Sequence, residues 1–324
     1  MRLAAFLISC AMPAMAQDLS IVPPLSLGHP IDCILGDTCY IQNYVDTDPS
    51  ETASDFLCGS LTYDTHKGTD FGLPSLAAME AGVEVLAAAV GTVRGVRNDM
   101  RDVIYSDDLS GEINGRDCGN GVVISHGDGW ETQYCHLKEG SVTVQSGETV
   151  TAGTPLGLVG LSGRTQFPHL HITVRRDGQT IDPFDPNNTA VCDSPPTETL
   201  WANPIETPQG GLLASGFADK IPEYDVVNAG TASVSQLSSD APIVLWGFAY
   251  GTRPDDVIAI SFSGPDGPLF ETRDVLDRTQ ALTMRAGGLN APDTGWQSGT
   301  YIGTVEHIRG DTVLSRQSTQ AAVP

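Results

Sequence analysis

Short hydrophobic runs separated by glycine-containing turns make up most of the chain between residues 61 and 184. Their β-branched residues and their alternation of apolar and polar positions favour strands over helices. Asp128 and Gly129, between two of the runs, form a dipeptide typical of a hairpin turn. The pattern therefore predicts a mainly β fold here. The predicted elements are strands at residues 40–45, 83–90, 91–96, 121–125 and 172–175, and one short helix at residues 76–81.

A second group of hydrophobic runs follows a stretch rich in proline, glycine and serine. Such a composition is typical of an exposed linker. The later runs, at residues 241–250, 257–263, 281–285 and 301–307, predict a small β-sandwich-like domain. We expect Trp246 and Trp296 to belong to its core, with stacking on a sugar as the alternative. The predicted organisation is a signal peptide at residues 1–16, a lead segment at 17–60, a first domain at 61–192, the linker at 193–211 and the sandwich-like domain at 212–324.

Four of the seven histidines lie in three short segments of the predicted first domain. The first segment holds His66 and Asp70. Gly68 between them disfavours a helix and allows a curled loop that brings both side chains to one metal ion. In the last segment, His169 and His171 stand two apart in a run of strand composition, so both imidazoles point to the same face. One of this pair can bind a metal while the other stands beside it.

His136 lies in the remaining segment, after the predicted hairpin turn. Catalytic zinc commonly takes three protein ligands and leaves a fourth position for water, whose pKa it lowers to about 7. Imidazoles that titrate near neutral pH suit the proton transfers that hydrolysis requires. Together the three segments predict a zinc hydrolase site. His29, His126 and His307 receive no such role, and we expect His126 to be structural.

These segments belong to an ordered series of motifs. The series also includes residues 119–126, 132–137, 150–157 and 159–165, and it closes with residues 168–171, 174–175 and 182–183. It resembles the lysostaphin-like zinc metallopeptidases, family M23, which cut peptide bonds in the stems and cross-bridges of bacterial peptidoglycan. The resemblance implies a lysostaphin-like antiparallel β-sheet catalytic domain. It also implies a zinc-dependent endopeptidase that hydrolyses peptidoglycan.

The resemblance implies a role for each key residue. His66, Asp70 and His171 would bind one zinc ion per chain, and His136 and His169 would be the catalytic histidines beside it. Amide hydrolysis needs a base that takes a proton from water, donors for the oxyanion and an acid for the leaving amine. The sequence does not divide the base and oxyanion roles between these two histidines.

The sequence departs from the family's usual pattern at two positions. Phe167 stands where many members have a small residue, and Cys135 occupies the variable position before His136. Phe167 would lie close to the metal, where it narrows the groove or stacks on substrate, unless it is a core aromatic. All key positions are intact, which favours an enzyme. The alternatives are a non-catalytic or autoinhibited wall-binding scaffold that activates other wall hydrolases, and a peptidase of proteins outside the wall.

The N-terminus predicts export. Arg2, an apolar stretch at residues 3–12 and the small residues Ala14 and Ala16 have the organisation of a secretory signal peptide that is cleaved near Ala16. The alternative is a lipoprotein, because Cys10 loosely matches a lipidation box. We therefore expect a periplasmic or secreted protein.

Cysteine usage agrees with export. Removal of the signal leaves six cysteines, an even number that suits three disulfides in an oxidising compartment. Cys33 and Cys39 are close in sequence, and Cys118 and Cys135 flank the predicted hairpin. We expect these two pairs, although strand register could forbid either.

Net charge limits the partners. The chain carries a formal net charge of −23, which argues against nucleic acid. Peptidoglycan, the partner that the resemblance implies, must then be bound through a local groove rather than by overall attraction. After the signal, no run approaches the roughly 18–20 apolar residues of a membrane span, so we predict no transmembrane segment. The sequence predicts no oligomeric state.

Overall fold

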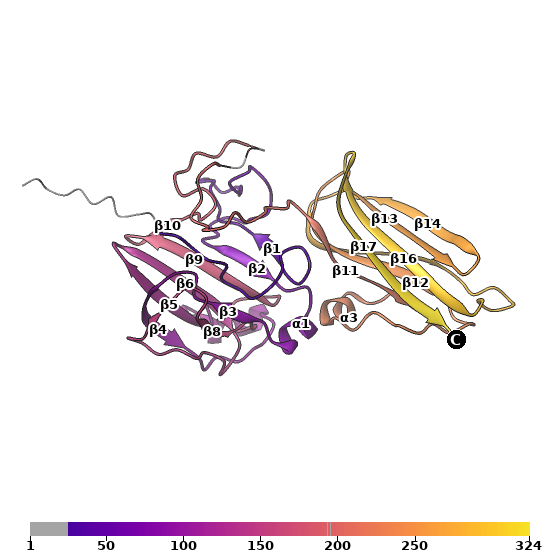
Figure 1. Cartoon of the computed structure of the whole chain (residues 1–324), viewed down its shortest axis with the longest axis horizontal. Coiled ribbons are helices and arrows are strands. Elements are labelled where there is room, and N and C mark those ends of the chain that lie inside the picture. The colour runs from indigo at the N-terminus through magenta and orange to yellow at the C-terminus, as the bar shows by residue number, and fades with distance from the viewer. Residues whose placement is uncertain (1–24, 193, 195) are drawn as a thin grey trace, which may run out of the picture.

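The computed structural model describes residues 25–192, 194 and 196–324, so the predicted signal peptide lies outside the described residues. Figure 1 shows two groups of strands side by side, the first coloured indigo to magenta and the second orange to yellow. The chain is mainly β and its sheets are antiparallel, which confirms the predicted fold class. Within the described part, no helix has the length and apolar character needed to cross a membrane.

Eight strands of the first group form one sheet in the order β1-β2-β9-β6-β5-β4-β7, with β10 also paired to β9. Their bounds are β1 Tyr40–Asn43, β2 Thr69–Gly72, β4 Gly91–Arg97, β5 Asn120–Gly127, β6 Trp130–Leu137, β7 Thr149–Val150, β9 His169–Arg176 and β10 Gln179–Ile181. Asp128 and Gly129 join β5 to β6, which confirms the predicted hairpin. The strands β3 (Glu84–Leu86) and β8 (Pro155–Leu158) form a separate pair. The helical elements are α1 Leu76–Ala81, the 3-10 helix η1 Asp107–Leu109 and α2 Ser110–Ile113. Of these, α1 is the helix that the sequence predicted.

Alternation along β9 gives this sheet two different faces. Leu170, Ile172 and Val174 lie in the hydrophobic core, and each is at most 1% exposed. Successive side chains of a strand point to opposite faces. His169 and His171 therefore lie on the face away from the core, where polar chemistry is possible.

The lead segment belongs to the same sheet and core. β1 pairs with β2, and Leu27 and Ile31 are buried among the side chains of the first core. Trp201, from the predicted linker, lies in that core as well and is bridged to Leu27. Both segments thus help to build the structure around the candidate site.

The predicted strand at residues 83–90 is wrong in its second half, because β3 ends at Leu86. The next two N–H groups find partners outside any ladder. Ala87 donates to Thr154 O at 2.9 Å, and Ala88 donates to Tyr134 Oη at 2.8 Å. These bonds satisfy the backbone without a neighbouring strand.

The second group forms the predicted sandwich-like arrangement. Its sheets have the orders β11-β12-β15 and β14-β13-β16-β17. Trp296 packs on the core between these two sheets, as expected. Trp246 is 3% exposed but does not belong to that core: it lies on the other face of β12, in a separate buried cluster that includes Tyr40 of β1. The strands β11, β14 and β17 and the helix α3 (Tyr224–Ala229) were not predicted from the sequence. The strand bounds are β11 Gly211–Ala218, β12 Ile243–Thr252, β13 Val257–Gly264, β14 Gly267–Val275, β15 Gln280–Leu289, β16 Gly299–Arg309 and β17 Thr312–Val323.

Three disulfides connect the six cysteines of the described chain. Cys33–Cys39 and Cys118–Cys135 are both formed, which confirms the two expected pairs. The third, Cys58–Cys192, joins residues 134 apart and ties the lead segment to the end of the first group of strands.

Candidate metal centre and active site

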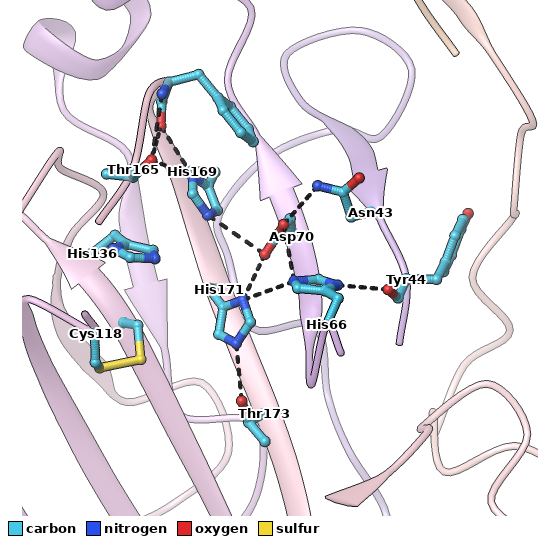
Figure 2. A network of polar contacts seen from close by, with 12 residues as sticks. Asn43, Tyr44, His66, Asp70, Cys118, His136, Thr165, His169, His171 and Thr173 are labelled. Carbon is cyan, nitrogen blue, oxygen red and sulfur yellow. Dashed lines mark hydrogen bonds and ion pairs between the residues drawn. A yellow bond between two sulfur atoms is a disulfide. The ribbon is translucent and has the colours of Figure 1, made fainter. Parts of the chain in front are cut away.

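The register between β2 and β9 brings the first candidate residues together. Asp70 lies directly opposite His171 on the neighbouring strand. The loop from His66 to β2 runs so close to β9 that a Cβ at Gly68 would lie 2.5 Å from His171 Nε2 and 2.6 Å from Ile172 O. Glycine is therefore required for this approach. Figure 2 shows the side chains of His66, Asp70 and His171 pointing toward one another.

The three side chains place one possible ligand atom each around a common point. His66 Nε2 is 3.2 Å from His171 Nδ1 and 3.2 Å from Asp70 Oδ2. His171 Nδ1 is 2.7 Å from Asp70 Oδ1. Ligand atoms around tetrahedral zinc are about 3.4 Å apart, so a zinc ion fits after a small separation of the side chains. Among the described residues, no other group of three metal-binding side chains converges in this way.

A second hydrogen bond orients each imidazole. His66 Nδ1–H donates to the carbonyl oxygen of Tyr44 at 2.6 Å, which leaves Nε2 as the atom with a free lone pair. His171 Nε2 lies 3.0 Å from Thr173 Oγ1, so its Nδ1 faces the common point. Bonds of this kind fix the tautomer and the ring orientation of metal-binding histidines.

Asp70 provides the negative charge of the cluster. Burial raises the pKa of Asp70, but the neighbouring His66, His169 and His171 outweigh it and hold this pKa well below its usual value. Burial also lowers the pKa of His66, and the charge of Asp70 outweighs that effect and raises it. Asn43 Nδ2 donates to Asp70 Oδ2 at 2.9 Å. Among the described residues, no lysine or arginine nitrogen lies within 4.0 Å of this carboxylate.

His169 and His136 lie beside the cluster. His169 Nε2 is 3.5 Å from Asp70 Oδ1, and the ring centres of His136 and His169 are 4.6 Å apart. The two imidazoles belong to residues that are 7% and 4% exposed, respectively. The structure thus brings all five residues of the predicted site together (Figure 2).

Both imidazoles use Nδ1 to bind a carbonyl. His136 Nδ1–H donates to Ser162 O at 2.8 Å, and His169 Nδ1–H donates to Phe167 O at 3.0 Å. In a neutral ring this leaves Nε2 without a proton. Burial lowers the pKa of His169 and, with the charges of the neighbouring imidazoles, holds that of His136 well below its usual value. Both rings are therefore neutral at neutral pH and able to accept a proton.

A groove of about 990 Å³ contains all five residues. Phe167 forms part of its wall and stacks on His169, with ring centres 4.3 Å apart and an angle of 17° between the planes. Lys67, Arg164 and Arg175 also line the groove. Phe167 is half-buried and therefore contacts both the imidazole of His169 and the open groove.

Residues 64–183 match peptidase family M23. The chain contains a family M23 domain. The chain is 31% identical over 133 residues to the peptidoglycan DD-endopeptidase ShyA of Vibrio cholerae, an overlap that covers 41% of this chain and 25% of the relative. The DD-carboxypeptidase/endopeptidase Mpg of Neisseria meningitidis is 33% identical over 122 residues, or 38% of this chain and 23% of the relative.

The murein hydrolase activator EnvC of Escherichia coli is also similar to this chain. It is 37% identical over 99 residues, which cover 31% of this chain and 22% of EnvC. The chain therefore spans about a quarter of the length of the relatives that it matches.

Several contacts of the M23 site were not predicted from the sequence. They come from Asn43, Tyr44, Ser162, Thr165 and Thr173. Thr173 had a usable signal, because a residue two places after the second histidine of the pair lies on the same face of the strand. The sequence contained no such signal for Asn43 and Tyr44, since they precede the matched M23 segment and form no motif with it.

His126 lies outside the cluster and holds the β5–β6 hairpin. Its Nδ1 is 2.7 Å from Val90 O, and its Nε2 is 2.8 Å from Thr132 Oγ1. Both ring nitrogens therefore have partners within the fold. This agrees with the structural role expected for His126.

Proposed function

We propose that this chain is an exported, zinc-dependent endopeptidase that hydrolyses peptide bonds in the stems or cross-bridges of peptidoglycan. The observation that carries the proposal is the convergence of three ligand atoms in a groove beside two neutral imidazoles. The M23 match supports peptidase activity. The names of ShyA and Mpg support peptidoglycan as the substrate.

The residues that would hold zinc are His66 through Nε2, His171 through Nδ1 and Asp70 through its carboxylate. Bound there, zinc would supply a Lewis acid that polarises the scissile carbonyl and acidifies water. Zinc requires deprotonated ligands. The depressed pKa of Asp70 keeps its carboxylate ionised, and the hydrogen bonds at the outer nitrogens of both histidines turn their inner nitrogens toward the metal position.

His136 and His169 would handle the protons. Each neutral ring has a free lone pair on Nε2, so it can take a proton from the attacking water. The imidazolium that results can donate that proton to the leaving amine or a hydrogen bond to the oxyanion. The carbonyls of Ser162 and Phe167 accept from Nδ1 in both charge states, so they hold the rings in place throughout.

The groove also suits a peptide substrate, although the protein as a whole is acidic. Its wall carries three basic residues, Lys67, Arg164 and Arg175, and four acidic ones, Asp64, Asp70, Asp107 and Asp117. The chain as a whole has 17 basic and 40 acidic residues, so this local balance is less acidic than the average. Charge in the groove can therefore contact the carboxylates of stem peptides at short range, where bulk repulsion matters less.

Export is part of the proposal. The predicted signal peptide would direct the chain to the periplasm or the exterior, where its substrate lies. Three disulfides in the described chain fit an oxidising compartment, because disulfides are rare in reducing ones.

The test measures zinc in the purified protein and, by mass spectrometry, the products released from purified peptidoglycan. We expect one zinc per chain and new stem or bridge termini that disappear on chelation and return when zinc is added. The mass of each product identifies the bond that is cut. Release that persists after complete zinc removal would contradict zinc dependence, and cleavage of added proteins with intact peptidoglycan would contradict the substrate.

A second candidate is favoured by the similarity to EnvC, which is named a murein hydrolase activator. In that case the chain would bind purified peptidoglycan saturably and release nothing. It would then increase product release by an added murein hydrolase. The intact ligand set favours the enzyme, because binding alone does not need three converging metal ligands.

A further inference from the structure

We propose that the Cys118–Cys135 disulfide positions His136 for catalysis, a proposal that rests on the hydrolytic function above. Cys135 directly precedes His136 in β6, and its partner Cys118 lies just before β5. The disulfide therefore joins the two sides of the hairpin at the point where the catalytic histidine stands.

The backbone at His136 adopts a conformation that needs support. Its φ is +62°, in the left-handed region that side chains other than glycine seldom adopt. In the pairing of β5 with β6, Asn120 lies opposite Leu137 and Val122 lies opposite Tyr134. The two residues Cys135 and His136 thus lie opposite one residue of β5, which makes a β-bulge. Such a conformation is energetically unfavourable and persists only where the surroundings enforce it.

Hydrogen bonds on both sides of the peptide enforce it. His136 N–H donates to Cys118 O at 2.8 Å, and His136 O accepts from Gly160 N–H at 2.9 Å. The imidazole is held separately, through Nδ1 and Ser162 O. One of the two backbone bonds thus depends on where Cys118 lies, and the disulfide fixes Cys118 to the neighbour of His136 in sequence.

The disulfide also belongs to the groove. Cys118 and Cys135 both line it, and Cys135 lies opposite His171 in the register of β6 and β9. No cysteine of the other two disulfides lines this groove. Loss of the Cys118–Cys135 bond therefore releases the wall that carries His136, whereas loss of Cys33–Cys39 releases a short loop elsewhere.

The experiment compares Cys118→Ser/Cys135→Ser with the matched control Cys33→Ser/Cys39→Ser. On soluble cross-linked muropeptides we expect kcat to fall about 10–100-fold in the first variant, since displacing a catalytic group by about 1 Å has effects of that order. KM and the zinc content should not change, because none of the three proposed metal ligands lies on β6. The control should keep the wild-type kcat.

A second readout does not depend on activity. The imidazole nitrogen resonances of His136, identified by their loss in His136→Ala, should shift and broaden in Cys118→Ser/Cys135→Ser and remain unchanged in the control. If the wild type releases no product, the proposed function fails, and these resonances still decide whether the disulfide positions His136.

Two results would overturn the proposal. One is a Cys118→Ser/Cys135→Ser protein with wild-type kcat and wild-type His136 resonances. The other is a failure to fold, both of that variant and of Cys118→Ala/Cys135→Val, which preserves more of the buried volume. In that case the disulfide holds the sheet together and has no separate role at His136.

Discussion

Each group of strands contains a buried aspartate that contacts histidine. Asp70 is surrounded by three imidazoles and an asparagine amide. Asp256 accepts from His307 Nε2 at 2.8 Å and from Arg309 Nε and Nη2, both at 2.8 Å. Asp70 is 2% exposed and Asp256 is 1% exposed, so burial does not distinguish them. The two aspartates differ in that the guanidinium of Arg309 binds Asp256.

Arg309 neutralises Asp256 permanently, whereas Asp70 has only titratable neighbours among the described residues. The histidines respond in opposite directions. Asp70 outweighs burial and raises the pKa of His66, while burial, assisted by the charge of Arg309, lowers the pKa of His307 despite its bond to Asp256. A buried carboxylate without a fixed cation, open to a groove, is suited to bind a metal ion. A carboxylate paired with arginine is suited to stabilise the fold.

Removal of each carboxylate tests this difference most directly. In Asp70→Ala we expect loss of zinc and a fall in hydrolysis of about 10³-fold or more, since a catalytic metal supplies several kcal/mol of transition-state stabilisation. Zinc content by atomic emission and product release from peptidoglycan measure both effects. Asp256→Ala is the matched control and should keep zinc and activity. Equal zinc loss in the two variants would mean that the clusters do not differ in this way.

Within the first cluster, single substitutions separate the proposed metal ligands from the proposed proton carriers. His136→Ala and His169→Ala should each retain one zinc per chain and lose hydrolysis by about 10²–10⁴-fold, the usual size of a general acid–base contribution. His171→Ala should lose zinc as well. The measurement is zinc content beside kcat for each variant. A His169→Ala protein that loses its zinc would move this residue into the ligand set.

Spacing made the first cluster predictable. His66 and Asp70 are four residues apart, and the i,i+2 pair of β9 needs no tertiary information to place both imidazoles on one face. The hydrogen bonds from the lead segment were not predictable in this way. Asn43 and Tyr44 reach the site only because β1 pairs with β2, and no local pattern indicates that pairing.

The second cluster shows why the rest of the molecule was harder to predict. Asp256 and His307 are 51 residues apart in the chain, and they meet through the pairing of β13 with β16. The unpredicted strands β14 and β17 have many exposed polar positions, so their hydrophobic pattern is weak. Their strand character comes from pairing with β13 and β16, which is a tertiary property.

The next prediction concerns stability. Asp256→Ala leaves the guanidinium of Arg309 and the ring of His307 without their shared acceptor, so we expect the free energy of unfolding to fall by about 3 kcal/mol. Asp274→Ala removes an exposed partner of Arg285 and should cost about 1 kcal/mol or less. Urea denaturation of the zinc-loaded proteins measures both. Equal decreases in the free energy of unfolding would show that the buried Asp256 cluster stabilises the fold no more than an exposed ion pair does.

The smallest expected effect is on the pH dependence of the free energy of unfolding. Because the pKa of His307 is lowered in the folded state, the unfolded chain binds this proton first as the pH falls below about 6.5, and the free energy of unfolding decreases. His307→Gln preserves a donor for Asp256 and removes that proton. Between pH 7 and 5, with zinc saturating, its stability should depend less on pH than that of the wild type, by at most about 1.4 kcal/mol per pH unit. An unchanged slope in urea denaturation would mean that His307 titrates alike in both states, and the contrast with His66 would then rest on geometry alone.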